Sequence, residues 1–246
     1  HNGSIYKVDA SSETKQIITV GYDKPLSSLK SWDFSGKSLW RAPFINEYAL
    51  SIALSPNGNT LLASFREGLI RFIDTQKGSK GEKFQGQQHN QKVWALTTSP
   101  TGKLALSGDD GGTVILWDTT KRNSKKIWQK HDNNSEVRTV SFSHDEKLFL
   151  SAGYDGKIYK VNIEDYSYRL LYENKEIKIK TALFSLDGNF IIAGDNKGIV
   201  RIWRTSDGEL LKEFQAHQKE VNGLAFTKKD RFLITCGSDK KIKIWK

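Results

Sequence analysis

The sequence predicts an all-β protein, a β-propeller in which one small antiparallel sheet is repeated six times. Three observations lead to this fold class. A polar turn recurs every 42 to 44 residues, apolar residues alternate with polar ones between the turns, and no stretch longer than about one helical turn keeps a 3.6-residue period. A repeat of about 40 to 45 residues with four antiparallel strands is typical of a propeller blade.

Two features that recur in phase define the repeats. The first is a turn of the type LSPNG, whose copies begin 44, 44, 42 and 42 residues apart, at Leu54, Thr98, Phe142, Phe184 and Phe226. The second is an apolar triplet that ends in Trp or a substitute, at Trp32, Ile73, Trp117, Val161, Trp203 and Trp245. Together they predict a single domain of six repeats with approximate bounds of 1–44, 45–88, 89–130, 131–174, 175–216 and 217–246.

Each repeat supplies its strands in the same order. In the third repeat the first three strands are predicted at 93–99, 104–108 and 112–118. A fourth, outer strand follows the Trp position, but after Trp245 only Lys246 remains, so the last blade lacks an outer strand of its own. We therefore expect that the sequence comes from a longer protein. A six-bladed ring, a seven-bladed ring completed by flanking sequence and an open array all remain open.

The composition limits the class of protein. Lys and Arg number 38 against 28 Asp and Glu, a formal net charge of +10 that favours an anionic partner, either a phosphopeptide, an acidic protein surface or nucleic acid. The single cysteine, Cys236, excludes an intrachain disulfide framework, and we expect a reducing, cytoplasmic setting. No run approaches the roughly 18 apolar residues of a membrane span, so no membrane insertion is expected.

Tripeptides around the recurring Trp carry a resemblance to a known family. They are, in chain order, SWD at 31–33, LWD at 116–118, IWR at 202–204 and IWK at 244–246, with FID at 72–74 and KVN at 160–162 as degenerate copies. With this spacing the whole chain resembles the WD-repeat (WD40) β-propeller family. The resemblance implies a rigid, noncatalytic scaffold for protein–protein interaction, often the sensor or assembly module of a larger multidomain protein.

The resemblance also implies a structural role for the histidines. In the family, a His before the first strand, a Ser or Thr on the second, an Asp in the next turn and the Trp of the third strand form a hydrogen-bonded tetrad inside one blade. The third repeat has Gly111 at the Asp position and Asp110 one place earlier, and repeats two and five lack the His and are expected to be the least rigid. One repeat matches in full, with His217, Thr235, Asp239 and Trp245, and the first repeat matches with His1, Thr19, Asp23 and Trp32 but has three extra residues in the turn.

These histidines predict neither a metal site nor a catalytic triad. Copies at one phase of the repeat lie on different blades, too far apart to share an ion in tetrahedral geometry. The spacing of Ser, His and Asp repeats with the blade, and the sequence has no Gly-x-Ser-x-Gly nucleophile elbow. It also has no phosphate-binding loop, paired-carboxylate spacing, zinc signature or thiol nucleophile. We therefore expect a protein that is not an enzyme and that has no cofactor and no metal.

By the same resemblance, partner contacts lie at one end of the blades, beside the start of the first strand and in the turn before the tetrad Asp. Aromatic and cationic side chains dominate these positions, although Asp110, Glu136 and Glu220 are acidic. Exposed Trp, Tyr and Arg are frequent binding hot spots, and Arg pairs with carboxylates or phosphates. The predicted partner-binding residues are Tyr6, Tyr22, Tyr48, Arg66, Lys92, Trp94, Arg138, Tyr154, Lys178, Lys180 and Asn222.

These positions predict a protein or peptide partner of acidic character. Three alternatives remain open. A one-residue slip in the strand alternation would bury half of these side chains. Nucleic-acid or phosphate-ligand binding would also fit the net charge, and nucleic-acid binding would show a steep salt dependence. An enzyme with a central-channel site would need acids or ligands that converge near the axis, which the phase of the repeat does not supply.

Overall fold

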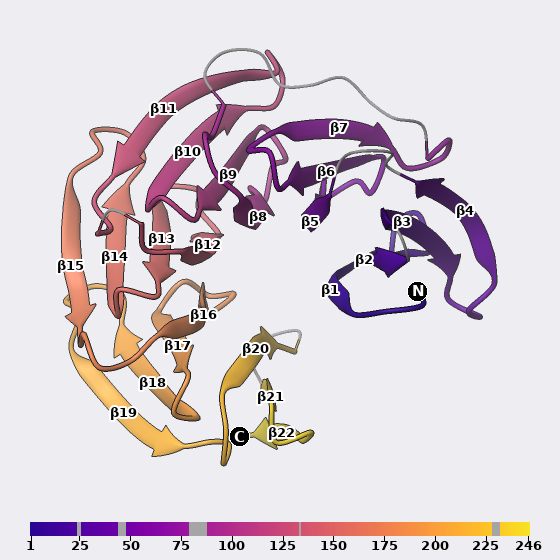
Figure 1. Cartoon of the computed structure of the whole chain (residues 1–246). Coiled ribbons are helices and arrows are strands. Elements are labelled where there is room, and N and C mark those ends of the chain that lie inside the picture. The colour runs from indigo at the N-terminus through magenta and orange to yellow at the C-terminus, as the bar shows by residue number, and fades with distance from the viewer. Residues whose placement is uncertain (24–25, 44–47, 79–87, 133, 228–231) are drawn as a thin grey trace. The chain divides into compact units, whose positions relative to one another are not determined.

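The computed structural model describes residues 1–23, 26–43, 48–78, 88–132, 134–227 and 232–246. These residues form twenty-two strands in six antiparallel sheets (Figure 1). They contain no helix, and hence none that is long and apolar enough to cross a membrane. The predicted all-β fold class, with sheets of the propeller-blade type, is confirmed. The chain divides into two compact units, 1–129 and 130–246, and each unit contains three of the sheets.

The first unit contains the first three sheets, and in each sheet the strands lie in chain order. The second sheet has three strands in the described residues, because its predicted outer strand falls mainly on 79–87, outside them. The strands of the unit are β1 (Ile5–Ser11), β2 (Gln16–Asp23), β3 (Leu26–Asp33) and β4 (Ser38–Pro43); β5 (Ala49–Leu54), β6 (Thr60–Phe65) and β7 (Ile70–Asp74); and β8 (Val93–Thr98), β9 (Leu104–Asp109), β10 (Thr113–Asp118) and β11 (Asn123–Gln129).

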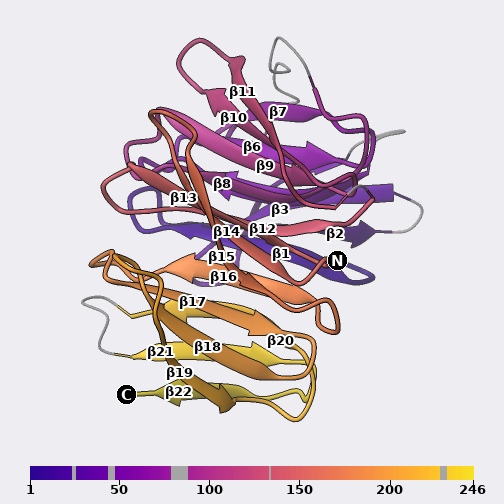
Figure 2. The same ribbon diagram turned by 90° about the vertical axis from the view of Figure 1, so that its left-hand side faces the viewer.

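The second unit has the same plan. Its last sheet has three strands in the described residues and ends with β22. Figure 2 shows two sheets of this unit, β16–β19 and β20–β22, stacked on one another, and β16 and β17 contact β20. The strands are β12 (Val137–Phe142), β13 (Leu148–Gly153), β14 (Lys157–Asn162) and β15 (Tyr168–Glu173); β16 (Ile179–Phe184), β17 (Phe190–Asp195), β18 (Ile199–Arg204) and β19 (Leu210–Gln215); and β20 (Val221–Phe226), β21 (Leu233–Gly237) and β22 (Ile242–Trp245).

The apolar core lies between successive sheets of a unit. The first strand of one sheet contacts the first strand of the next, so that β1, β5 and β8 follow one another, as do β12, β16 and β20. Ile18 and Val20 of the first sheet pack in one cluster with Ile52 and Leu61 of the second. All six residues of β5 are buried, because this strand has a neighbouring sheet on both faces. The predicted alternation of apolar and polar residues is therefore absent from this inner strand.

The polar turn recurs because it needs a hydroxyl side chain as a hydrogen-bond acceptor and a residue that can adopt the left-handed backbone conformation. In the second sheet the Ser55 Oγ accepts the N–H of Thr60 at 3.0 Å, and the Ser55 carbonyl accepts the N–H of Gly58 at 2.8 Å. Gly58 has a φ of 70°, a conformation that glycine adopts without steric cost. The same hydroxyl contact, to the residue five places later, is made in four further copies, by Ser99, Ser143, Ser185 and Thr227.

Replacing Gly102 in the third copy of this turn with alanine is expected to lower the free energy of unfolding by about 2 kcal/mol. Gly102 has a φ of +73°, and an added Cβ would lie 2.9 Å from the Cδ of Pro56 in the neighbouring turn. Gly188→Ala is the matched control, since its φ is also +73° but an added Cβ meets nothing within 4 Å. Chemical denaturation of both variants measures the difference. Equal losses of unfolding free energy in the two variants would show that an added methyl group at Gly102 makes no steric clash with Pro56.

Candidate functional site

Hydrogen-bonded tetrads form inside single sheets at the predicted positions. In the sixth sheet His217 Nδ1 lies 2.8 Å from Asp239 Oδ1 and His217 Nε2 lies 2.7 Å from Thr235 Oγ1, which also accepts the indole N–H of Trp245 at 3.0 Å. In the first sheet His1 Nε2 lies 2.9 Å and Trp32 Nε1 3.1 Å from Thr19 Oγ1. The His1–Asp23 contact is longer, at 3.4 Å, because Asp23 also accepts from Ser28 at 2.5 Å and pairs with Lys30 at 2.9 Å.

The third sheet has a complete tetrad, and the expectation for its Asp position was wrong. His89 Nδ1 lies 2.7 Å from Asp109 Oδ2 and His89 Nε2 lies 2.6 Å from Ser107 Oγ, which accepts from Trp117 Nε1 at 2.8 Å. Asp109 is the last residue of β9, two places before Gly111. Its carboxylate also accepts the backbone N–H of Gly111 at 2.9 Å, so one side chain holds both the turn and the histidine. Asp110 is thereby left for another role.

In the fourth sheet the tetrad lacks the indole, since Val161 stands at the Trp position, but it keeps the charged carboxylate of Asp155. His131 Nδ1 lies 2.9 Å from Asp155 Oδ2, and His131 Nε2 lies 2.6 Å from Ser151 Oγ. Burial raises the pKa of Asp155, but hydrogen bonds and charge attraction from His131 outweigh this, so the pKa of the carboxyl lies below its usual value. Asp155 is therefore ionised at neutral pH, and its role is to orient a buried histidine inside the sheet.

The fifth sheet replaces the histidine with an arginine from the neighbouring strand. Arg201 on β18 is 5% exposed, its guanidinium lies 2.6 Å from Asp195 Oδ2 at the end of β17, and its Nε lies 2.5 Å from Glu213 on β19. Asp195 is 0% exposed and occupies the position that Asp109 has in the third sheet. This sheet therefore has a buried ion pair where low rigidity was expected. Within the described residues, no group of three or more His, Cys, Asp or Glu side chains could hold a metal ion.

The predicted partner-binding positions follow from a backbone contact that all six repeats share. The donor is a backbone N–H at or just after the end of the second strand, and the acceptor is the carbonyl of the residue just before the first strand. The bond is 2.9 to 3.0 Å long in each repeat. This bond brings a turn residue beside a strand-entry residue whatever their side chains are. The six pairs are Tyr22 with Ser4, Arg66 with Tyr48, Asp110 with Lys92, Tyr154 with Glu136, Asn196 with Lys178 and Ser238 with Glu220.

In the first unit the structure brings six of the predicted residues together. They line one open pocket of about 370 Å³ with Leu50, which is buried. The residues come from all three sheets of the unit, which is why no single stretch of sequence contains the pocket. We call this set the first cluster, and its members are Tyr6, Tyr22, Tyr48, Leu50, Arg66, Lys92 and Trp94.

Asp110 fixes the charge and the shape of the first cluster. Its carboxylate accepts the indole N–H of Trp94, and its other oxygen lies 3.5 Å from the Nζ of Lys92. Arg66 lies over the ring of Tyr48, with its Cζ 5.9 Å from the ring centroid, and it forms no ion pair with any carboxylate of the described residues. The pocket therefore combines aromatic walls with one cation that no carboxylate of the described residues compensates. Asp110 was absent from the predicted set, because an acid on a basic face gives no sequence signal for positioning.

In the second unit three predicted cations surround one predicted tyrosine. The ring centroid of Tyr154 lies 5.4 Å from Arg138 Cζ, 4.7 Å from Lys178 Nζ and 5.2 Å from Lys180 Nζ, and Lys180 also donates to the Tyr154 hydroxyl at 3.0 Å. We call these four residues the second cluster. Asn222, the remaining predicted residue, donates its side-chain amide to Ser238 Oγ at 2.9 Å.

Two glutamates partly compensate the second cluster. Glu136 lies 3.4 Å from Arg138, and Glu220 lies 3.2 Å from Lys180. Burial lowers the pKa of Lys180, but hydrogen bonds with Tyr154 and Glu220 outweigh this and leave the pKa of the ammonium above its usual value. Lys178 is exposed and forms no ion pair with a carboxylate in the described part of the chain. Among the described residues, three positive charges of the second cluster thus face two glutamates that pair with it.

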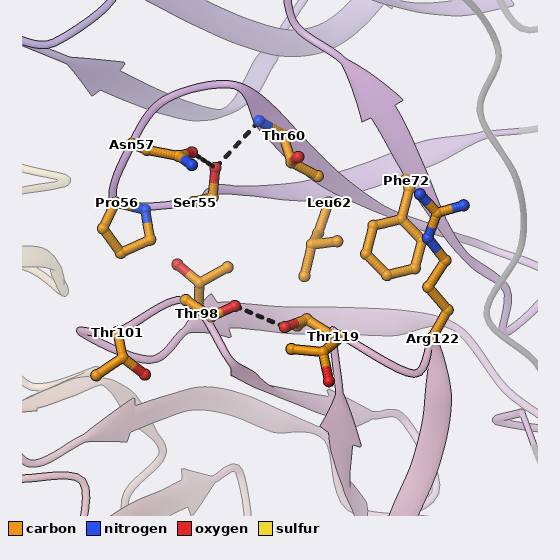
Figure 3. A pocket seen from close by; sticks show the side chains of 12 residues that line it. Ser55, Pro56, Asn57, Thr60, Leu62, Phe72, Thr98, Thr101, Thr119 and Arg122 are labelled. Atoms are coloured by element: carbon orange, nitrogen blue, oxygen red, sulfur yellow. Dashed lines mark hydrogen bonds between the residues drawn. The ribbon is translucent and has the colours of Figure 1, made fainter.

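A further pocket, of about 310 Å³, lies between the second and third sheets of the first unit and contains none of the predicted residues (Figure 3). Leu62 and Phe72 form its apolar side, and Arg122 lies 5.0 Å from the ring centroid of Phe72. Its hydroxyls are used inside the protein, since Thr98 and Thr119 donate to the carbonyls of Leu54 and Gly102, each at 2.6 Å. The Thr98 contact joins the two sheets and the Thr119 contact lies within the third sheet, so this pocket is explained by the packing of the two sheets.

Comparison with known proteins agrees with the tetrads and the repeat. The sequence pattern of the family described as "WD domain, G-beta repeat" matches residues 81–118, 122–160, 171–204 and 208–246, more than half of the chain. Among similar proteins are Polyadenylation factor subunit 2 of Candida albicans, 28% identical over 94 residues, and Methylosome protein WDR77 of Xenopus laevis, 35% identical over 75 residues. A third is the Protein LST8 homolog of Dictyostelium discoideum, 31% identical over 80 residues.

These matches cover 38%, 30% and 30% of this chain and 17%, 22% and 26% of the respective relatives. The chain therefore aligns with about a quarter or less of each relative's length, and the similarity supports the repeat and not the activity of a whole relative. The phase of the matched segments agrees with the sheets, since three of them contain a whole third strand with its Trp, and the segment 122–160 ends within the third strand β14, one residue before Val161. On the family pattern, the chain belongs to the WD40 repeat family.

Proposed function

We propose that this protein is a noncatalytic interaction module that binds acidic segments of protein partners, at the first cluster and at the second cluster. WD40 proteins are typically interaction scaffolds or assembly factors, which supports the general class. The observation that carries the specific proposal is the pocket of the first cluster, where six residues from three sheets line one open hollow. Structural packing alone does not require four aromatic rings and two cations at such a place.

The chemistry of the first cluster favours a peptide with an apolar or aromatic side chain next to a carboxylate. Tyr and Trp side chains bury a large area at low cost in conformational entropy. The guanidinium of Arg66 can form a bidentate pair with a carboxylate. Lys92 is already paired with Asp110, so Arg66 is the cation that an incoming carboxylate would meet first.

An assembly role within a larger protein or complex fits this kind of site. One relative is by its name a subunit of a polyadenylation factor, and another is named a methylosome protein. We propose by analogy that this chain serves as the sensor or assembly module of a larger system inside the cell. Its target there is a protein segment.

Replacing Trp94 with alanine is expected to weaken binding of an acidic peptide by about 30-fold, the loss of roughly 2 kcal/mol typical of a hot spot. The probe is a labelled synthetic peptide in which one Trp or Phe is flanked by glutamates, measured by fluorescence anisotropy. The same peptide with glutamine for glutamate should bind much more weakly, as should the original peptide to Arg66→Ala.

Phe34→Ala is the matched control, because Phe34 is an exposed aromatic side chain, 58% accessible, in the turn after β3 and outside both clusters. This variant should bind like the unmodified protein. Unchanged affinity in both Trp94→Ala and Arg66→Ala, or equal binding of the glutamine peptide, would overturn the proposed function.

A further inference from the structure

We infer that the second cluster is a site for a phosphate monoester, and that its ligand is a phosphorylated side chain of the protein partner. The inference deepens the proposed function and rests on it, since it names a chemical group within the acidic segment. It follows from three features of the second cluster. Cations surround Tyr154, two glutamates would compete with an incoming anion for those cations, and several hydrogen-bond donors lie near the ring.

Three cations around one ring repel one another. Arg138, Lys178 and Lys180 all lie within 5.4 Å of the centroid of Tyr154. Attraction to the face of the ring offsets part of this repulsion. An anion between the cations would relieve the rest, since opposite charges in close contact attract one another near a protein surface.

The two glutamates determine which kind of anion would gain the most binding free energy at the second cluster. Glu136 and Glu220 already contact Arg138 and Lys180, so an incoming carboxylate would replace one monoanion with another and gain little. A phosphate monoester carries about −1.5 to −2 charges at pH 7 and has three acceptor oxygens. It can therefore compete with the glutamates where a carboxylate cannot. A phosphodiester, as in RNA, carries one charge per phosphate and has the same disadvantage as a carboxylate.

The donors of the cluster match a group with three oxygens. Lys178 offers an exposed ammonium, and the long contact of 3.4 Å between Arg138 and Glu136 can be exchanged for a bidentate pair with phosphate. The Tyr154 hydroxyl accepts from Lys180, so its own proton is directed elsewhere and can be donated to the ligand. Arg138 and Tyr154 belong to the fourth sheet and Lys178 and Lys180 to the segment that enters β16, so two neighbouring sheets of one unit hold the site.

The test compares three versions of one labelled peptide that carry phosphoserine, glutamate or serine at a single position. We expect the phosphoserine peptide to bind about tenfold more tightly than the glutamate peptide, and Lys178→Ala to remove this preference. Lys178→Arg should restore it. Inorganic phosphate in excess should compete with the phosphopeptide, and should compete more weakly than the phosphopeptide itself, because free phosphate makes no flanking contacts.

Lys175→Ala is the matched control, an exposed lysine in the preceding turn outside the cluster, and it should keep the preference. Tyr154→Phe, which removes only the hydroxyl, gives a second and milder variant, and thermal denaturation shows whether each variant folds. Equal binding of the phosphoserine and glutamate peptides overturns the inference, as does a preference that survives Lys178→Ala. Single-stranded RNA that binds as tightly as the phosphopeptide, with loss in Lys178→Ala, would also overturn it.

The outcome can be separated from that of the proposed function. If glutamate peptides bind through Trp94 and Arg66 while phosphorylation adds nothing, the first cluster stands and only the phosphate site fails. If no acidic peptide binds at the first cluster, the proposed function fails whatever the second cluster does.

Discussion

Replacing Asp109 with alanine is expected to lower the free energy of unfolding by about 3 kcal/mol. Asp109 is 2% exposed, and its carboxylate accepts from His89, Gly111 and Thr113 at 2.7 to 2.9 Å. The variant leaves a buried histidine and two backbone N–H groups without their acceptor. Chemical denaturation at neutral pH, with one probe for secondary structure and one for tryptophan fluorescence, measures the loss.

Asp110→Ala is the informative control for this prediction, because sequence reasoning pointed to Asp110 and not to Asp109. Asp110 contacts Trp94 and Lys92 at the surface, so its removal is expected to cost less than about 1 kcal/mol. It should instead weaken peptide binding, since Trp94 would lose the contact that orients it. A larger stability loss for Asp110→Ala than for Asp109→Ala would contradict the tetrad described for the third sheet.

Asp195→Ala is expected to cost about 3 to 5 kcal/mol, the largest effect expected in the second unit. The substitution leaves the guanidinium of Arg201 buried beside an empty position, with Glu213 on the outer strand as its remaining carboxylate. Thermal and chemical denaturation should both show the loss. The fifth sheet would then be the first part of the unit to open, which hydrogen exchange of β17 and β18 can detect.

The matched experiment removes both charges of that pair. Arg201→Met combined with Asp195→Ala takes away the uncompensated cation and keeps the length of the side chain, so much of the lost stability should return. If the double variant is as unstable as the sum of the two single ones, the residues do not act as a pair and the account of the fifth sheet is wrong.

The period of the sequence was enough to predict the sheets and which residues share one backbone contact in every repeat. Equivalent residues of successive repeats have equivalent backbone contacts, so Tyr48, Arg66 and Trp94 could be placed at one end of their sheets by counting. Periodicity cannot show how far a side chain reaches. Asp109 lies two places before the expected position, yet its carboxylate reaches His89 at 2.7 Å, and an added Cβ at Gly111 would lie 3.3 Å from Asp109 Oδ1.

The arginine of the fifth sheet was missed for a related reason. Arg201 sits in the middle of a strand, where a charged residue is usually taken for an outward-facing one, and only the partner strands show that Asp195 and Glu213 meet it. The pairing of Asp110 with Trp94 is also invisible in the sequence, since each of the two residues belongs to a different strand or turn of its repeat.

The shared backbone bond between turn and strand entry has a consequence for how such proteins diverge. Its six copies have nearly the same length, although the turn residues are Tyr, Arg, Asp, Tyr, Asn and Ser. A mutation at one of these positions therefore replaces one side chain and keeps this backbone bond in every copy. Under the proposed function, substitutions in different copies can thus alter the ligand preference one residue at a time while the framework stays the same.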